Sequence, residues 1–291
     1  MPQFPERVSR QSKIRRLEVW MHPAWHLRSS ASIDGLNCRS QIPRWPLIYS
    51  HTCHRAAARQ APGMQMQLSP RDLAQHIDHT LLKPDATSEQ IRQLCAEARE
   101  NAFWSVCVNG SHVALAASLL EDTEVKVAAV VGFPLGACGA DVKRFETETV
   151  IDLGAQEIDL VLAVGALKEG NHKLVLRELR DVVEAAEGVP VKVILETCLL
   201  TREEKIVACS LVVESGARFV KTSTGFSSGG ATLDDVRLMR ECVGARFGVK
   251  ASGGIRDTAT ALAMIDAGAT RLGTSAGVAI VRGHSAEPAG Y

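Results

Sequence analysis

The chain of 291 residues lacks any run of about 18 consecutive apolar residues, the length that a membrane-spanning helix needs. Its first residues also lack the uninterrupted apolar segment of a secretory signal. It contains 8 cysteines, but none are spaced as Cys-x-x-Cys, and a chain of this size does not need disulfides to hold its core. We therefore expect a cytoplasmic protein with reduced thiols and no contact with a membrane.

The chain also lacks net charge at pH 7, because 33 Lys and Arg balance 33 Asp and Glu. This balance hides a difference between two parts of the sequence. Residues 1–66 contain 10 Lys and Arg against 3 Asp and Glu, which leaves 23 against 30 for the rest of the chain. The larger part is acidic, so we do not expect it to bind nucleic acid, which usually requires a basic face.

Residues 1–66 form a basic segment that does not share the pattern of the rest. Three of the four tryptophans lie here without helical or strand periodicity, and prolines interrupt any amphipathic helix. The segment is either a transit peptide or a disordered, over-extended N-terminus, with Met64 or Met66 as the working start. We favour the second interpretation and expect residues 67–291 to form one domain.

From Ser69 onward, short β-branched segments alternate with longer segments of helical periodicity. Ser69 to Asp72 predicts a short helix with a serine N-cap, and Thr87 to Gln90 predicts a capping box. Strands are predicted at Ile77–Leu82, Trp104–Val108, Val125–Val131, Glu157–Val164, Val191–Leu195, Arg218–Thr222, Phe247–Ser252 and Thr270–Gly273. Helices are predicted between them, including Val142–Leu153, Leu174–Ala186, Arg202–Glu214, Leu233–Glu241 and Thr258–Asp266. This alternation favours an α/β fold, a closed (β/α)8 TIM barrel with an extra N-terminal capping helix, over an open doubly wound sheet.

Three Gly-Ala pairs each end a predicted helix and begin a strand, at residues 154–155, 216–217 and 268–269. We expect the glycines to be left-handed C-caps. Counting five residues on from each glycine reaches Asp159, Lys221 and Gly273, which therefore share one register and face the same side of their strands. Lys250 lies six residues after Gly244, and a bulge at Gly248 would restore its register.

Lys221 and Lys250 each close an apolar strand where small, turn-forming residues follow, which is where such barrels carry out their chemistry. A buried ammonium needs acidic partners, and a second cation nearby favours loss of its proton. The pair predicts a Schiff-base enzyme in which Lys221 attacks a carbonyl, Lys250 lowers the pKa of Lys221 and relays protons, and Asp159 transfers protons. The structural alternatives are a Lys221 that reaches solvent and a Lys250 that forms a salt bridge with Asp159 or Glu196.

Four further side chains lie near these strands. Asp78 and Glu196 are each consistent with a site role or with a structural hydrogen bond. Cys107 lies late in a strand and is a candidate for lining the site, although a buried inert thiol is more common. His79 beside Asp78 suggests a metal, but no second histidine falls at ligand spacing in the barrel, so we expect no metal and no cofactor.

Two glycine-containing turns follow the last two predicted strands, at residues 253–256 and 273–277. Backbone N–H groups in such turns, together with a helix N-terminus, bind anions. The loops after the last two strands are also the usual phosphate position in this kind of barrel. We therefore expect a phosphorylated substrate.

These motifs together resemble the deoxyribose-phosphate aldolase family over roughly Leu68 to Val281. The resemblance is carried by the segments 77–83, 132–136, 157–159, 219–226, 250–256 and 273–275. It implies a metal-independent class I aldolase and a homodimer, acting in deoxyribose phosphate catabolism. The reaction would be reversible cleavage of 2-deoxy-D-ribose 5-phosphate to D-glyceraldehyde 3-phosphate and acetaldehyde.

By position, the resemblance implies that Lys221 is the Schiff-base lysine, Lys250 its activating partner and Asp159 the acid/base. It implies phosphate contacts from Thr224, Gly253, Gly254 and Ser275. Phe226 stands where some members have a lysine near the phosphate, which leaves neutralisation to another group such as Arg256. The alternatives are another phosphosugar Schiff-base aldolase or transaldolase, a metal-dependent aldolase, and a barrel that senses a sugar phosphate without turnover.

Overall fold

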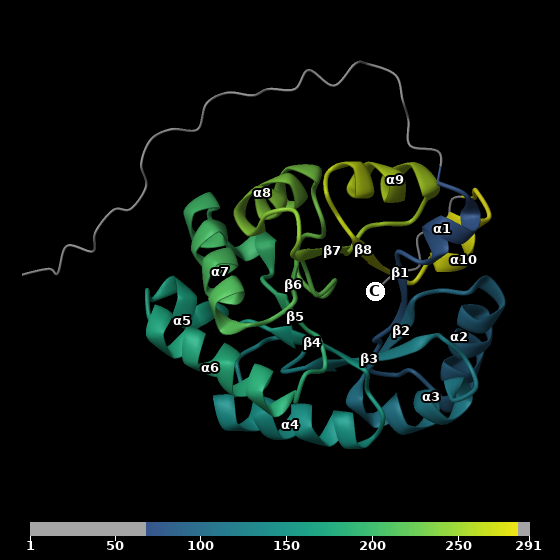
Figure 1. Cartoon of the computed structure of the whole chain (residues 1–291), viewed down its shortest axis with the longest axis horizontal. Helices are drawn as coiled ribbons and strands as arrows, with labels where there is room; N and C mark the ends of the chain where they lie inside the picture. The colour runs from purple at the N-terminus through teal and green to yellow at the C-terminus, as the bar shows by residue number, and fades with distance from the viewer. Residues whose placement is uncertain (1–67, 285–291) are drawn as a thin grey trace, which may run out of the picture. The chain divides into compact units, whose positions relative to one another are not determined.

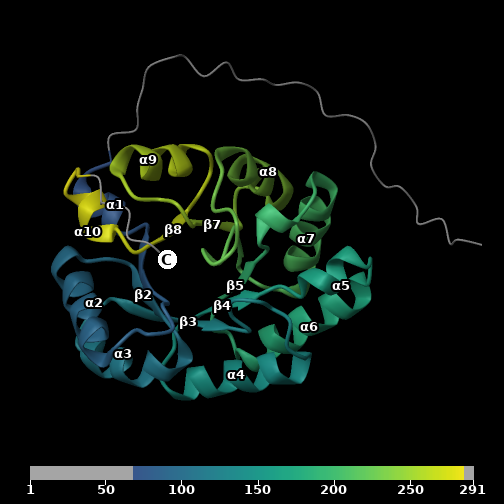
Figure 2. The same ribbon diagram turned by 180° about the vertical axis from the view of Figure 1, so that it is seen from behind.

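The computed structural model describes residues 68–284, in which eight parallel strands form a closed barrel with helices around it (Figure 1, and Figure 2 from behind). Neighbours in the barrel follow chain order, and β8 pairs with β1 to close it. The strands are β1 (Ile77–Leu81), β2 (Ser105–Val108), β3 (Lys126–Val131), β4 (Glu157–Val161), β5 (Val191–Ile194), β6 (Phe219–Lys221), β7 (Gly248–Ser252) and β8 (Arg271–Thr274). The predicted (β/α)8 barrel is confirmed. The predictions for residues 1–66 lie outside the described residues.

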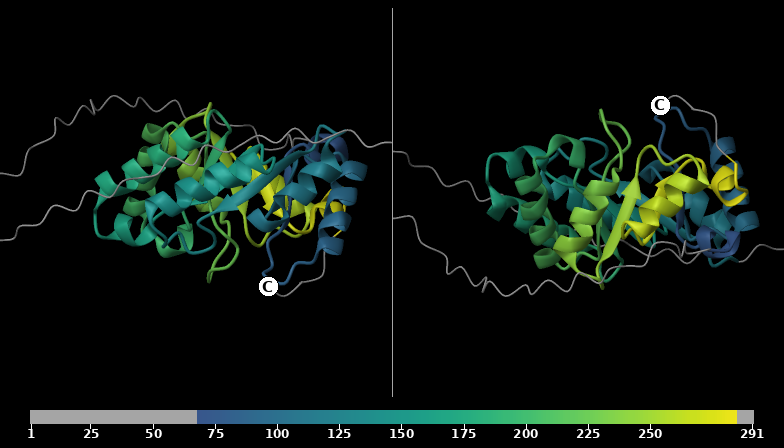
Figure 3. Two further views of the ribbon diagram at one scale, coloured as in Figure 1. Left: turned by 90° about the horizontal axis from the view of Figure 1, so that it is seen from below. Right: turned by 90° about the horizontal axis from the view of Figure 1, so that it is seen from above.

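The helices cover the outside of the barrel, as the two side views in Figure 3 show. The extra N-terminal helix, α1 (Pro70–Ala74), precedes β1 and lies beside α10 (Gly277–Val281). The other helices are α2 (Ser88–Asn101), α3 (Val113–Leu120), α4 (Ala140–Asp152), α5 (Val164–Lys168), α6 (His172–Ala185), α7 (Arg202–Ser215), α8 (Leu233–Val243) and α9 (Thr258–Asp266). Between residues 68 and 284, no helix is long and apolar enough to cross a membrane.

Local sequence explains where several of these helices begin and end. The predicted capping box of α2 is present: Thr87 Oγ1 accepts a hydrogen bond from the backbone N–H of Gln90, whose side chain accepts one from the backbone N–H of Thr87. Gly154, Gly216 and Gly268 have φ angles of 107°, 89° and 114°, as predicted for glycines that end helices. Each of these turns starts the next strand in a defined register.

The structure differs from the prediction at the end of β4. The strand ends at Val161, and Val164 begins α5. Between them the chain turns, since the backbone N–H of Val164 donates to the carbonyl of Leu162 at 2.9 Å. The segment is apolar throughout, and hydrophobicity alone does not distinguish a buried strand from a buried turn that begins a helix.

The predicted bulge at Gly248 is wrong, because β6 and β7 pair in regular register, with Phe219 opposite Gly248 and Lys221 opposite Lys250. The extra residue lies in the loop 244–247, which is one residue longer than the loop 216–218 before β6. Gly248 instead leaves room for the ring of Phe219, since an added Cβ would lie 2.1 Å from it. The strand therefore needs glycine for packing.

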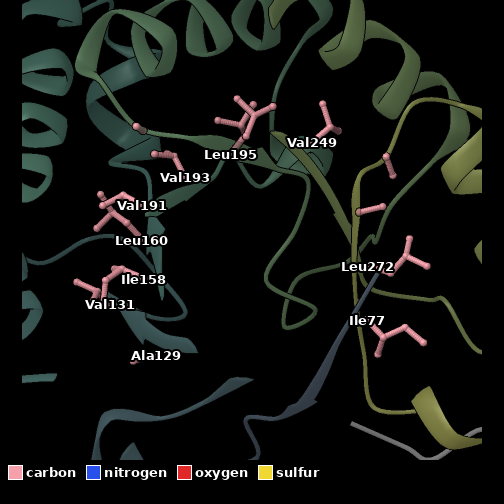
Figure 4. Packing of buried hydrophobic residues seen from close by; sticks show 14 of the residues in the cluster. Ile77, Ala129, Val131, Ile158, Leu160, Val191, Val193, Leu195, Val249 and Leu272 are labelled. Carbon is pink, nitrogen blue, oxygen red and sulfur yellow. The ribbon is translucent and has the colours of Figure 1, made fainter. Parts of the chain in front are cut away.

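Alternate side chains of each strand face the helices and form the main hydrophobic core (Figure 4). On β4 and β5 these are Ile158, Leu160, Val191 and Val193. Each such buried side chain contributes about 1.5–3 kcal/mol relative to an exposed one. Because the period of a strand is two, the residues between them point into the barrel, and this inner face carries the charged side chains.

Candidate active site

Seven charged side chains from six strands meet inside the barrel, and all of them are buried. We call this group the interior charge cluster: Asp78 (β1), Glu157 and Asp159 (β4), Lys192 (β5), Lys221 (β6), Lys250 (β7) and Arg271 (β8). Buried charges are costly unless they are paired and hydrogen-bonded. The contacts among these side chains therefore determine which of them keep their charge.

Asp159 lies at the centre of the cluster and accepts hydrogen bonds from three lysines. Its Oδ1 accepts from Lys192 Nζ at 2.7 Å, and its Oδ2 accepts from Lys221 Nζ and Lys250 Nζ, also at 2.7 Å. Burial alone would raise the pKa of Asp159, but the charges of Lys192, Lys221 and Lys250 hold it well below its usual range. Asp159 is therefore an ionised carboxylate within reach of the predicted nucleophile.

Lys250 contacts two carboxylates. Besides Asp159, its Nζ donates to Asp78, whose other oxygen accepts from Arg271 Nη1 at 2.8 Å. Burial would lower the pKa of Lys250, but Asp159 and Asp78 together hold it above its usual range. An added Cβ on Gly273 would lie 3.0 Å from Lys250 Cε, so the glycine at this position of β8 leaves room for the lysine side chain. Lys250 is therefore held as a cation.

Lys221 differs from the other two lysines because it contacts only one carboxylate, that of Asp159. Its side chain keeps 3% of its surface exposed, whereas those of Lys192 and Lys250 have none. Burial, assisted by the charge of Lys250, lowers the pKa of Lys221 despite the attraction of Asp159. It is therefore the lysine of the cluster best placed to become a neutral, accessible nucleophile.

Three members of the cluster were not predicted from the sequence: Lys192, Glu157 and Arg271. Lys192 and Arg271 both donate to Glu157 Oε2, at 2.9 and 3.0 Å. The sequence contains a signal for each of these three residues. Lys192 interrupts an apolar strand just as Asp159 does. Glu157 and Arg271 each lie two residues before a residue predicted to face inward, Asp159 and Gly273.

Aromatic rings surround the guanidinium of Arg271. Its Cζ lies 4.4 Å from the centroid of the Trp104 ring and 5.4 Å from that of Phe219. The indole Nε1–H of Trp104 donates to Glu157 Oε1 at 3.0 Å. Arg271 and Glu157 are thus held in place by packing as well as by charge.

One wall of the barrel interior is apolar. Cys107 lies there with Leu82, Ala128, Val130 and Phe133. Its thiol is 3.9 Å from Asp159 Oδ2, and burial, followed by the charge of Asp159, raises its pKa to about 11. Cys107 therefore lies beside Asp159 in the barrel interior as a protonated thiol. An apolar wall beside a charged one suits a short carbon chain with a reactive carbonyl.

Glu196 lies outside the cluster and does not pair with Lys250. The salt bridges of Lys250 are with Asp159 and Asp78. The carboxylate of Glu196 is buried and accepts hydrogen bonds from the hydroxyl of Thr224 at 2.5 Å and from its backbone N–H at 3.3 Å. The Thr224 hydroxyl accepts in turn from the backbone N–H of Phe226 at 3.0 Å. Glu196 thus fixes the loop after β6, and an anion at Thr224 would compete with it.

The other predicted phosphate contacts lie in the loops after β7 and β8. Gly253 and Gly254 have φ angles of 87° and 83°, which favour glycine. The carbonyl of Gly253 accepts from the backbone N–H of Ala231 at 3.0 Å. Ser275 is exposed between β8 and α10. The structure therefore places these three residues beyond the carboxyl ends of the last two strands. This is the end of the barrel at which Lys221 closes β6.

Two remaining predictions concern Phe226 and His79. Phe226 is 39% exposed, and its ring meets that of Phe133 edge to face at a centroid distance of 5.2 Å. His79 lies outside the cluster and shares a 2.7 Å contact from Nε2 to Glu97 on α2. Among residues 68–284, no group of three or more His, Cys, Asp and Glu side chains is arranged to hold a metal ion.

Comparisons with known proteins agree in both sequence and structure. A family model described as DeoC/LacD family aldolase matches residues 73–284. A protein of Alkaliphilus oremlandii named deoxyribose-phosphate aldolase is 61% identical over 221 residues, which cover 76% of this chain and 100% of that protein. One of the same name from Halalkalibacterium halodurans is 60% identical over 219 residues, covering 75% and 98%. A solved structure of deoxyribose phosphate aldolase from Aeropyrum pernix, described as a unique tetramer, has a TM-score of 0.70 and 36% identity, covering 74% and 91%.

Proposed function

Because the chain belongs to the DeoC/LacD family of aldolases, we propose that it cleaves 2-deoxy-D-ribose 5-phosphate reversibly to D-glyceraldehyde 3-phosphate and acetaldehyde. The observation that carries the proposal is the environment of Lys221, a buried amine with one carboxylate contact beside the cation of Lys250. The substrate is suggested by the names of relatives that are about 60% identical. The reaction belongs to the breakdown of deoxyribose phosphates.

In the proposed mechanism, neutral Lys221 attacks the aldehyde carbon C1 of the open-chain sugar. A bond forms between Nζ and C1, the carbonyl oxygen takes up a proton, and loss of water leaves a protonated imine. The C3 hydroxyl then loses its proton, the C2–C3 bond breaks, and its electron pair moves toward the imine nitrogen. Glyceraldehyde 3-phosphate leaves at this step. The enamine that remains is protonated at C2, and water releases acetaldehyde and restores Lys221.

Asp159 and Lys250 are proposed to move the protons of these steps. The Oδ2 of Asp159 is 2.7 Å from the Nζ of both lysines, so a proton has a short path between them. Lys250 also keeps a positive charge next to Lys221, which favours the neutral amine before attack. Cys107 is proposed to line the site beside Asp159, and Asp78 to hold Lys250.

The phosphate of the substrate is proposed to bind beyond the ends of β6, β7 and β8, at Thr224, Gly253, Gly254 and Ser275. The positive φ angles of the two glycines turn the loop after β7 sharply, and backbone N–H groups in such turns bind anions. Ser223 lies beside Gly253, since a Cβ added to Gly253 would be 3.7 Å from Ser223 Cβ. The Ser223 hydroxyl is buried and has no hydrogen-bond partner, which supports a polar ligand at this place.

The proposal is tested by treating the protein with borohydride and deoxyribose 5-phosphate, followed by intact-mass analysis and peptide mapping. We expect a substrate-dependent reduced adduct on Lys221. Lys221→Ala should lose both adduct and turnover while remaining folded. Lys205→Ala is a matched control, because Lys205 pairs with Asp235 at 2.5 Å outside the barrel interior.

Other outcomes would point to the alternatives. Failure to form an adduct, with activity lost on treatment with EDTA, would indicate a metal-dependent aldolase. An adduct that yields different aldehydes would indicate another phosphosugar aldolase or a transaldolase. Binding of the sugar phosphate without any product would indicate a sensor.

We also propose that the enzyme is a cytoplasmic homodimer. Three apolar side chains on α4 and the loop before it support a surface for self-association: Leu135 is 77% exposed, Val142 56% and Phe145 69%. Light scattering after size exclusion should give twice the mass of the chain, and Phe145→Asp should shift it toward one chain. A mass of four chains would instead indicate a tetramer. The cytoplasmic location is tested by cell fractionation.

A further inference from the structure

Lys192 is completely buried on β5, and the proposed mechanism gives it no role of its own. It lies opposite Asp159 in the register between β4 and β5. Its Nζ donates to Asp159 Oδ1 at 2.7 Å and contacts Glu157 Oε2 at 2.9 Å. Lys221 and Lys250 share the other oxygen of Asp159. Lys192 therefore holds the opposite side of the carboxylate.

The charges of the cluster do not balance when every lysine is protonated. There are four cationic side chains and three carboxylates, so the cluster carries one surplus positive charge. Lys192, Lys250 and Arg271 each contact two carboxylates, whereas Lys221 contacts one. Since the guanidinium of Arg271 does not deprotonate, the proton that leaves most easily is that of Lys221.

The buried titratable and charged side chains that face Lys192 come from six other strands. They are Asp78 on β1, Cys107 on β2, Glu157 and Asp159 on β4, Lys221 on β6, Lys250 on β7 and Arg271 on β8. Cys107 remains a thiol and adds no charge. Lys126 on β3 has the same inward parity as Ala128 and Val130 but is half-exposed. The charge count therefore covers the buried charged side chains of the barrel interior.

We propose that Lys192 is a positioning residue: it fixes Asp159 through Oδ1 and supplies the fourth positive charge that makes Lys221 the amine that loses its proton. The inference rests on the proposed function, because a neutral Lys221 matters only if it attacks a carbonyl. Without the charge of Lys192, three cations would face three carboxylates, and Lys221 would keep its proton at neutral pH. Asp159 Oδ1 would also lose the hydrogen bond that it accepts from Lys192.

The central test is Lys192→Met. In this variant Asp159 keeps Lys221 and Lys250, and Glu157 keeps Arg271 and Trp104, so no carboxylate is left without a partner. The matched control is the double variant Lys143→Met, Glu178→Gln, which removes an equally buried ion pair, 2.5 Å long, outside the cluster and leaves no carboxylate without a partner. Both variants replace a buried ammonium by an apolar chain of similar length.

The measurement is kcat/KM for acetaldehyde release as a function of pH, from about pH 6 to about pH 10, across the range in which the lysine loses its proton. At pH 7 we expect Lys192→Met to be at least tenfold slower than the wild type, the effect of a unit charge on the order of 8 Å away at an effective dielectric constant of about 20. The difference should shrink as the pH rises. The double variant Lys143→Met, Glu178→Gln should follow the wild-type profile.

A second variant reverses the sign and keeps the test decisive if Lys192→Met does not fold. Glu157→Gln removes a carboxylate and increases the surplus of positive charge, so the rising limb of kcat/KM should move to lower pH. A loss that is constant over the pH range in Lys192→Met, or a limb that moves the same way in both variants, would overturn the inference. Absence of a borohydride adduct in the wild type would instead overturn the proposed function.

Discussion

Lys250→Met removes the positive charge nearest to the proposed nucleophile and should leave the fold intact. Asp78 keeps Arg271, and Asp159 keeps Lys192 and Lys221, so both carboxylates remain paired. Methionine is a flexible chain of similar length and fits the space above Gly273 that the lysine now occupies. The main physical change is therefore electrostatic.

The size of the effect follows from the geometry. The Nζ atoms of Lys221 and Lys250 each lie 2.7 Å from Asp159 Oδ2, so they can be at most twice that distance apart. At an effective dielectric constant of about 20, two unit charges at that separation repel each other by about 3 kcal/mol. Loss of this repulsion stabilises the ammonium form of Lys221 and lowers the fraction of neutral amine about a hundredfold.

The assay is the rate at which borohydride traps the adduct of deoxyribose 5-phosphate on Lys221, measured over a series of pH values. We expect trapping in Lys250→Met to be about a hundredfold slower than in the wild type at pH 7 and to rise about tenfold for each pH unit. A rate within a few-fold of the wild type at pH 7 would refute the electrostatic role. A slow rate without pH dependence would show that Lys250 acts only as a proton carrier.

Three further predictions concern packing, specificity and acid stability. Gly273→Ala should lower the free energy of unfolding by about 1–3 kcal/mol and reduce activity, because its Cβ would lie 2.9 Å from Ser252 Cβ and 3.0 Å from Lys250 Cε; urea unfolding and initial rates check both. The wild type should discriminate against unphosphorylated deoxyribose less than Phe226→Lys does; equal ratios of kcat/KM for the two sugars would contradict this. The folded protein lowers the pKa values of Asp78 and Asp159, so their ionised carboxylates stabilise the fold fully above the unfolded-state pKa of about 3.9. This contribution to the free energy of unfolding is lost progressively as the pH falls below that value. A urea midpoint that stays constant down to about pH 3 would contradict this.

Much of the fold could be predicted because short-range patterns determine it. The glycine at residue 216 ends α7 with positive φ, and from there the period of two places Lys221 inside the barrel. The same counting placed Asp159 inside. It failed to explain Lys250 correctly, because the extra residue lies in the loop before β7, and a loop of different length carries no signal in a strand pattern.

The partners of the buried charges could not be predicted in the same way. Asp78 and Arg271 are 193 residues apart in the sequence and meet only because β8 closes the barrel against β1. Both Asp159 and Glu196 were candidate partners for Lys250, and the structure brings Asp159 and Asp78 to it. Such choices depend on barrel closure and side-chain reach, which are properties of the assembled fold.

Asp159 is shared by three lysines, and this sharing has a consequence for protein engineering. Substitutions within the interior charge cluster should not have additive effects, because each change redistributes hydrogen bonds and protons among the remaining members. A double-mutant cycle between any two of them should therefore show a large coupling energy. A library that varies one interior charge at a time will mostly contain variants in which a buried charge has lost one of its partners. Altered substrate preference is more accessible through the loops beyond the strands. A residue there can be replaced without changing the protonation states of the interior charge cluster.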